Sequence, residues 1–143
     1  MAFKLGLSAV LNYKVDGQDA GGSWVEATNV QDVTLDLDKD TADVTTRGND
    51  GWEALVGTLK KASLKFKAIW DPDDAAFDAF MDAFLTDGAI IGFQVLDETS
   101  GIGLQADFMI TKFSRAEPLR EALTVDIEAV VTYSSTAPTW IGT

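Results

Sequence analysis

Polar and apolar residues alternate along much of the chain, with the period of two that is typical of strands buried on one face. The clearest example runs from Thr58 to Trp70. One face of this segment is apolar and consists of Ala62, Leu64, Phe66, Ala68 and Trp70. The other face carries Lys61, Ser63, Lys65 and Lys67. The pattern predicts a half-buried antiparallel strand whose polar face is basic.

Similar patterns predict further strands before and after this one, at about residues 5–15, 24–37, 89–96, 104–111 and 123–132. Residues 97–101 are typical of a hairpin connection. The polar segment at about 38–57 predicts a long loop, with a short β-prone piece at 43–46 that could pair at a sheet edge. The C-terminal residues 134–143 suggest an extended arm anchored by Trp140.

A helix is predicted at about 72–87, where the period changes. Asp71 suits the N-cap, Pro72 suits the first helical position, and Gly88 suits the end. Four large apolar residues follow helical spacing and form one stripe: Phe77, Phe80, Met81 and Phe84. Such a stripe is more typical of a core contact than of a ligand site.

These elements predict a mainly β protein, an antiparallel β-sandwich or barrel with one flanking helix. Residues 1–143 are interpreted as a single domain with extended N- and C-terminal arms. No apolar run reaches 18 residues, so no membrane span is expected. The N-terminal residues 1–15 are interpreted as a strand and not as a signal peptide, because Asn12 and Lys14 interrupt the apolar run.

The composition excludes most kinds of catalytic site. The chain has no cysteine and no histidine, which excludes thiolate nucleophiles, Ser-His arrangements and the commonest metal ligands. Its formal net charge of −12 disfavours attachment to nucleic acid phosphates. This charge is explained either as an acidic surface that promotes solubility or as the lining of a path through which a polyanion passes without sticking.

Two candidate chemical sites lack the residues or the placement that their chemistry needs. The segment Asp36 to Asp40 begins like a calcium loop, but Thr41 stands where glycine is needed and Arg47 where glutamate is needed. Asp107, Asp126 and Glu128 offer carboxylates, but nothing in the sequence places two of them across a cleft. We therefore expect no enzyme activity, no metal and no cofactor.

The segment from Thr45 to Glu53, Thr-Thr-x-Gly-x-x-Gly-Trp-Glu, resembles the major tail tube proteins of phages. Gly57, Ser63 in the following strand, Asp71 with the helix at 77–85, and the closing strand at 123–133 complete the resemblance, which covers about residues 24–133. The resemblance implies hexameric rings that stack into a hollow tube conducting DNA, located in the virion tail and assembled in the host cytoplasm. The implied partners are other copies of the chain, tape-measure proteins, and tail terminator or baseplate proteins.

The resemblance also assigns roles to residues. The loop between early strands is expected to contact the adjacent ring through Asp38, Asp40, Asp43, Arg47, Asp50, Trp52 and Glu53. Apart from the resemblance, three lysines of the strand at 58–70 have two interpretations, either an ordinary solubilising strand face or a subunit edge that meets acidic partners. These lysines are Lys61, Lys65 and Lys67. An acidic lumen is expected, with Asp107, Asp126 and Glu128 as its candidate residues.

Two alternatives stay open at this point. Four tryptophans in a β-rich chain, Trp24, Trp52, Trp70 and Trp140, are compatible with a monomeric carbohydrate-binding module. Within the same fold, the inner tube of a contractile injection system and the ring protein of type VI secretion are also compatible.

Overall fold

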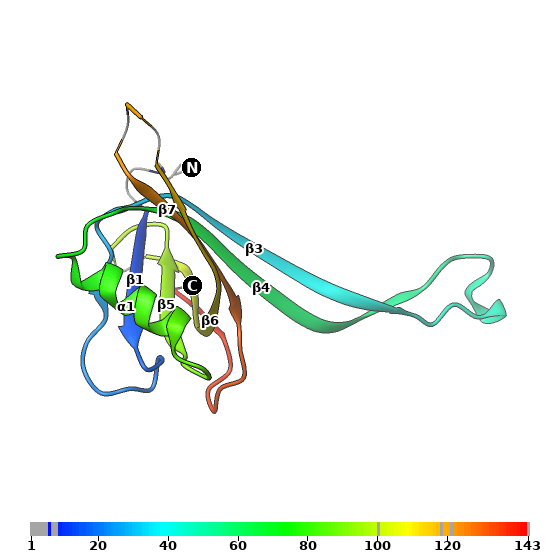
Figure 1. Ribbon diagram of the computed structural model, residues 1–143. Helices are drawn as coiled ribbons and strands as arrows, with labels where there is room; N and C mark the ends of the chain where they lie inside the picture. The colour runs from blue at the N-terminus through cyan, green and yellow to red at the C-terminus, as the bar shows by residue number, and fades with distance from the viewer. Residues whose placement is uncertain (1–5, 7–8, 100, 118, 121, 143) are drawn as a thin grey trace.

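The computed structural model describes residues 6, 9–99, 101–117, 119–120 and 122–142. It has a β-rich body from which one long hairpin projects (Figure 1). The elements in chain order are β1 (Val10–Val15), β2 (Val25–Glu26), β3 (Val30–Asp43), β4 (Leu55–Ile69), α1 (Ala75–Leu85), β5 (Ile91–Leu96), β6 (Gly103–Ala116), β7 (Thr124–Val131) and β8 (Thr139–Ile141). The prediction of a mainly β, antiparallel fold with one flanking helix is confirmed.

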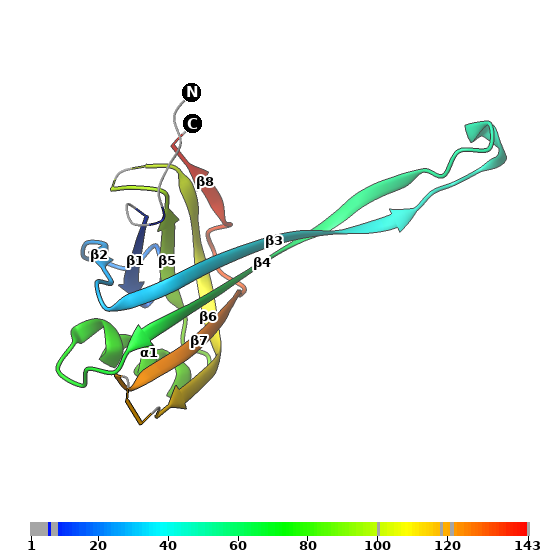
Figure 2. The same ribbon diagram turned by 90° about the horizontal axis from the view of Figure 1, so that it is seen from above.

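The strands of the described chain form a single eight-stranded sheet, in the order β2-β1-β5-β6-β7-β4-β3, with β8 attached to β6. Every pairing is antiparallel. The strand β6 joins the two parts of the sheet, because its first half pairs with β5 and its second half with β7. The sheet curls into a half-barrel, and α1 covers part of its inner side (Figure 2).

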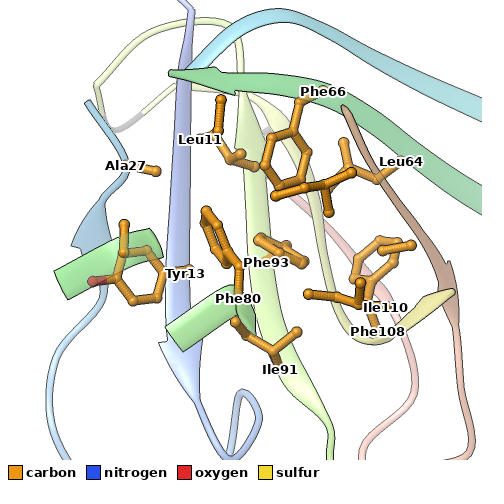
Figure 3. Packing of buried hydrophobic residues seen from close by; sticks show 14 of the residues in the cluster. Leu11, Tyr13, Ala27, Leu64, Phe66, Phe80, Ile91, Phe93, Phe108 and Ile110 are labelled. Carbon is orange, nitrogen blue, oxygen red and sulfur yellow. The ribbon is translucent and has the colours of Figure 1, made fainter. Parts of the chain in front are cut away.

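The core lies between the curled sheet and α1, and Phe80 is at its centre (Figure 3). The Phe80 ring lies 5.4 Å from Tyr13 of β1, 5.3 Å from Phe66 of β4 and 5.7 Å from Phe93 of β5, measured between ring centroids. Strands that are far apart in the sheet order therefore meet on one helical side chain. The contacts with Tyr13 and Phe66 are edge-to-face, and such aromatic pairs contribute about 0.5–1.5 kcal/mol beyond the burial of their apolar area.

The helix begins three residues later than predicted. Asp74, not Asp71, is the N-cap, and its side chain accepts a hydrogen bond from the backbone N–H of Ala76. Asp71 instead accepts from the backbone N–H of Asp73 at 3.1 Å, which holds residues 71–73 in a turn before the helix. The helix ends at Leu85, and Gly88 follows with a positive φ of 76°.

The predicted loop at 38–57 is confirmed for its middle part, residues 44–54, and wrong at both flanks. Its flanks are strand, because β3 continues to Asp43 and β4 begins at Leu55. The register pairs Ala42 with Val56 and Asp43 with Leu55, so only residues 44–54 connect the two strands. Away from the body both faces of this two-stranded ribbon are exposed, which removes the alternation by which a strand is recognised in a sequence.

The C-terminal segment folds back onto the body instead of extending away from it. In β8, Trp140 pairs with Leu104 and Ile141 with Gly103 of β6. The predicted N-terminal arm lies largely outside the described residues. Within the part of the chain that the structure describes, no helix has the length and apolar character needed to cross a membrane.

Candidate assembly surfaces

The β3–β4 hairpin carries several exposed apolar side chains where it projects from the body. Trp52, at its tip, is 77% exposed, and Leu59, on β4, is 72% exposed. Val44, Leu55 and Val56 on the same hairpin are also exposed. A two-stranded ribbon has no core of its own, so its apolar side chains gain stability only when another surface covers them.

The tip of the hairpin has a defined local structure. The Thr45 hydroxyl accepts a hydrogen bond from the backbone N–H of Ala54 at 2.9 Å, and the N–H of Val44 donates to the Ala54 carbonyl at 3.0 Å. Residues 47–49 form a 3-10 turn, and Asp50 and Gly51 reverse the chain with positive φ angles of 53° and 83°. The glycine-containing segment therefore has a defined, hydrogen-bonded conformation and is not an irregular loop.

The residues predicted to contact an adjacent ring are spread along the whole hairpin. Asp38, Asp40 and Asp43 lie on β3, whereas Arg47, Asp50, Trp52 and Glu53 lie at the tip. Asp40 pairs with Lys61 of β4 at 3.2 Å within the chain. The hydroxyl and backbone N–H of Thr45 hydrogen-bond to Asp43 and lower the pKa of its carboxyl below the usual range. Sequence reasoning missed Leu59, although an apolar residue at a polar position of an alternating strand was a visible signal.

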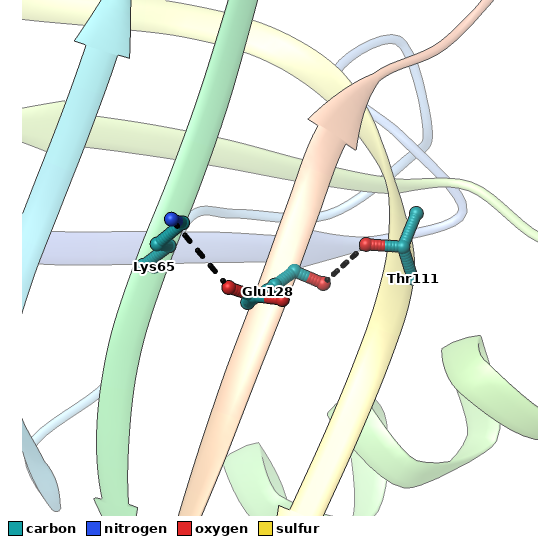
Figure 4. A network of polar contacts seen from close by, with 3 residues as sticks. All are labelled: Lys65, Thr111 and Glu128. Carbon is teal, nitrogen blue, oxygen red and sulfur yellow. Dashed lines mark hydrogen bonds and ion pairs between the residues drawn. The ribbon is translucent and has the colours of Figure 1, made fainter.

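The strand β4 is not an edge of the sheet over residues 63–68, where it pairs with both β3 and β7, so the predicted edge role of Lys65 and Lys67 is wrong. Lys61 lies beyond the pairing with β7 and has a register partner only on β3. β4 lies between β3 and β7. Lys65 pairs with Glu128 of β7, with 3.6 Å between Nζ and Oε1, and Thr111 of β6 donates to the Glu128 backbone carbonyl (Figure 4). The lysines therefore have acidic neighbours within their own subunit.

Four neighbouring strands, β3, β4, β7 and β6, form one part of the sheet, and the side of these strands that faces away from α1 is called the four-strand face. In the described chain, an unpaired strand edge lies at each end of this face. β3 pairs only with β4, which leaves its other edge open. Residues 109–116 of β6 pair only with β7, because the pairing of β6 with β5 ends at Phe108. Because the four strands alternate in direction, the open edges of β3 and β6 run antiparallel to each other.

Two of the three lumen candidates lie on this face. Asp126 is paired with Lys67, and Glu128 with Lys65, in the register of β7 and β4. Asp107 is only 2% exposed, so its prediction as a lumen residue is wrong. The Asp107 carboxylate accepts hydrogen bonds from the backbone N–H of Gln18 at 2.6 Å and from the hydroxyl of Ser134, and it anchors two segments that cover β6.

The remaining candidates do not form a common site. Asp36 to Asp40 is extended within β3, and no group of three or more acidic side chains in the described ranges is arranged to hold a metal ion. The four tryptophans lie on separate segments: Trp24 before β2, Trp52 at the hairpin tip, Trp70 after β4 and Trp140 in β8. Trp70 belongs to the core region, with its ring 4.6 Å from that of Phe77.

The chain has open strand edges and an exposed hairpin, and comparison with known proteins shows its family. A family model described as phage tail tube protein matches residues 8–134. The chain belongs to the phage tail tube protein family. It is a structural subunit of that kind, and the suspected resemblance is confirmed. A comparison with curated protein sequences finds no significant match.

Solved structures show the same fold. A chain from the tail of an empty gene transfer agent particle, determined with C6 symmetry, has a TM-score of 0.78 and 21% identity over 98% of this chain and 100% of that chain. The SPP1 tail tube has a TM-score of 0.76 and 14% identity over 98% and 80% of the two chains. A chain of the anti-feeding prophage baseplate has a TM-score of 0.66 and 8% identity over 99% and 97%. The fold is therefore shared by chains from a gene transfer agent tail, a tail tube and a prophage baseplate.

Proposed function

We propose that this tail tube subunit forms hexameric rings that stack into a hollow tube through which DNA passes. The observation that carries the proposal is the projecting β3–β4 hairpin with its exposed apolar side chains, Trp52 and Leu59 above all. Membership of the tail tube family and the C6 symmetry of the gene transfer agent tail support six subunits per ring. The hairpin reaches a neighbouring ring, where its apolar residues become buried.

Within a ring, the four-strand face supports closure into a continuous barrel. The open edge of β3 in one subunit pairs with residues 109–116 of β6 in the next subunit. The two edges are antiparallel, so rotation about a ring axis brings them together with the polarity that a ladder of hydrogen bonds requires. Closure also removes two exposed edges that would otherwise promote aggregation. The four-strand face, including Asp126 and Glu128, then lines the lumen.

The mechanism is geometric and needs no catalytic group. Tape-measure proteins and tail terminator or baseplate proteins are the expected partners at the inside and at the ends of the tube. The subunits assemble in the host cytoplasm, and the finished tube acts as a passive conduit for DNA.

The test separates ring formation from stacking. In a shortened variant, residues 43–55 are replaced by Asn-Gly, a two-residue turn that joins the directly opposed residues Ala42 and Val56. We expect electron microscopy of the wild-type chain to show tubes, and the shortened chain to give single rings. Circular dichroism and thermal unfolding serve as the control that the body remains folded. A wild-type chain that stays monomeric at high concentration would overturn the proposal, and tubes from the shortened chain would exclude a stacking role for residues 43–55, Trp52 included.

A further inference from the structure

A shallow hollow of about 320 Å³ lies on the four-strand face, and its charged groups are balanced. Three carboxylates and three lysines line it: Asp32, Asp126, Glu128, Lys65, Lys67 and Lys112. The hollow therefore contributes no net charge, and the whole net charge of −12 is carried elsewhere in the chain. Residues 71–87, which include α1, hold six aspartates and no lysine or arginine.

The balance is fixed by the register of the sheet. Glu128 lies between Lys65 of β4 and Lys112 of β6, its Cα partners on either side. Asp126 lies beside Lys67 in the adjacent row. Directly opposed residues of neighbouring strands point to the same face and lie about 5 Å apart, less than the Debye length of about 8 Å at physiological ionic strength. Opposite charges this close largely cancel at the distance of a passing duplex.

We propose that this hollow is a charge-compensated wall, in which carboxylates held in register with lysines stop those lysines from binding DNA phosphates. The inference rests on the proposed function for the position of the face in the lumen. It differs from the acidic lumen expected from the sequence, because the hollow itself carries no net charge and so does not act by net repulsion. Three uncompensated lysines per subunit would instead bind duplex DNA in a salt-dependent way.

The test uses preassembled tubes and a short fluorescent DNA duplex, measured by co-sedimentation at low and physiological salt. Asp126→Asn with Glu128→Gln removes two carboxylates from the hollow and keeps the side-chain shapes. We expect these tubes to retain at least about tenfold more DNA than wild-type tubes, with retention that falls as salt rises. The matched control, Asp82→Asn with Asp87→Asn, makes the same charge change at exposed positions in and just beyond α1, and we expect it to behave like wild type.

Equal DNA retention by the hollow variant and the control would overturn the proposal, since bulk charge alone would then explain the effect. Lys65→Gln with Lys67→Gln provides the opposite change, and strong DNA retention by that variant would also overturn it. If a variant forms no tubes, the same comparison is made on the unassembled subunit, on which the hollow is open, by measuring the Kd for the duplex. If the wild-type chain forms no tubes, that result counts against the proposed function. The charge compensation in the hollow is then still decided by the Kd of the subunit variants for the duplex.

Discussion

The carboxylate of Asp107 accepts a 2.6 Å hydrogen bond from the backbone N–H of Gln18, a residue 89 positions away in the sequence. Gln18 in turn donates from its side chain to the Thr136 carbonyl and accepts from Gln105. Asp107 also accepts from Ser134. One buried acid on β6 thus holds both the turn after β1 and the segment before β8 against the sheet.

Replacing Asp107 with alanine should destabilise the subunit by about 1–3 kcal/mol, because the buried N–H of Gln18 loses its acceptor. Asp107→Asn should recover part of this loss, since an amide oxygen still accepts that bond. The measurement is the free energy of unfolding in urea. Asp87→Ala, at an exposed position, is the control and should change it by less than about 0.5 kcal/mol. An equally stable Asp107→Ala variant would contradict the anchoring role.

Phe80→Ala should be among the most damaging single changes in the core. Phe80 is 1% exposed, and its ring contacts three strands of the curled sheet. Truncation leaves a cavity that those strands cannot fill, at a cost of about 3–5 kcal/mol. Phe84→Ala on the same helix is the matched control, because Phe84 is 40% exposed, and its loss should be clearly smaller in the same urea titration. Similar losses for the two variants would mean that Phe80 is not central to the core.

Local patterns predicted the elements that have one buried face. The stripe of Phe77 and Phe80 identified the helix, and the alternation around Leu64 and Phe66 identified β4, because burial on one side imposes a period on the sequence. The tip motif, with Gly51 and Trp52, also carried the family resemblance that the comparisons confirm. These signals are contained within short windows of sequence.

Features that depend on distant pairing were not predictable in this way. The outer part of the β3–β4 ribbon is exposed on both faces, so no period marks it. Asp107 occupies a polar position of an alternating strand, and only the covering segments near Gln18 and Ser134 make that position buried. The neighbours of Lys65 are set by strand register, which needs the complete sheet order.

Tyr13 should make the subunit sensitive to alkaline pH. Burial raises the pKa of its phenol above the ordinary value of 10.0, and the negative charge of Asp74 raises it further. The unfolded chain therefore loses this proton at lower pH than the folded chain, so rising pH through about 10 favours unfolding. Tyr13→Phe, which keeps the ring against Phe80, should reduce the fall in unfolding free energy across that range. Tyr133→Phe, at a residue 92% exposed, should leave the fall unchanged, and an identical effect of both variants would refute the assignment.

Leu59→Ser should separate folding from assembly. Leu59 is 72% exposed on the hairpin, so its loss should change the unfolding free energy of the isolated subunit by less than about 0.5 kcal/mol. If the side chain is buried against a neighbouring ring, its loss costs about 1.5–3 kcal/mol of association, which raises the concentration needed for tube formation by roughly 10- to 150-fold. Sedimentation across a concentration series measures this threshold. Leu85→Ser is the control, because Leu85 is comparably exposed on α1, away from the hairpin. If Leu59→Ser needs no higher concentration for tube formation than Leu85→Ser, the stacking contact lies elsewhere.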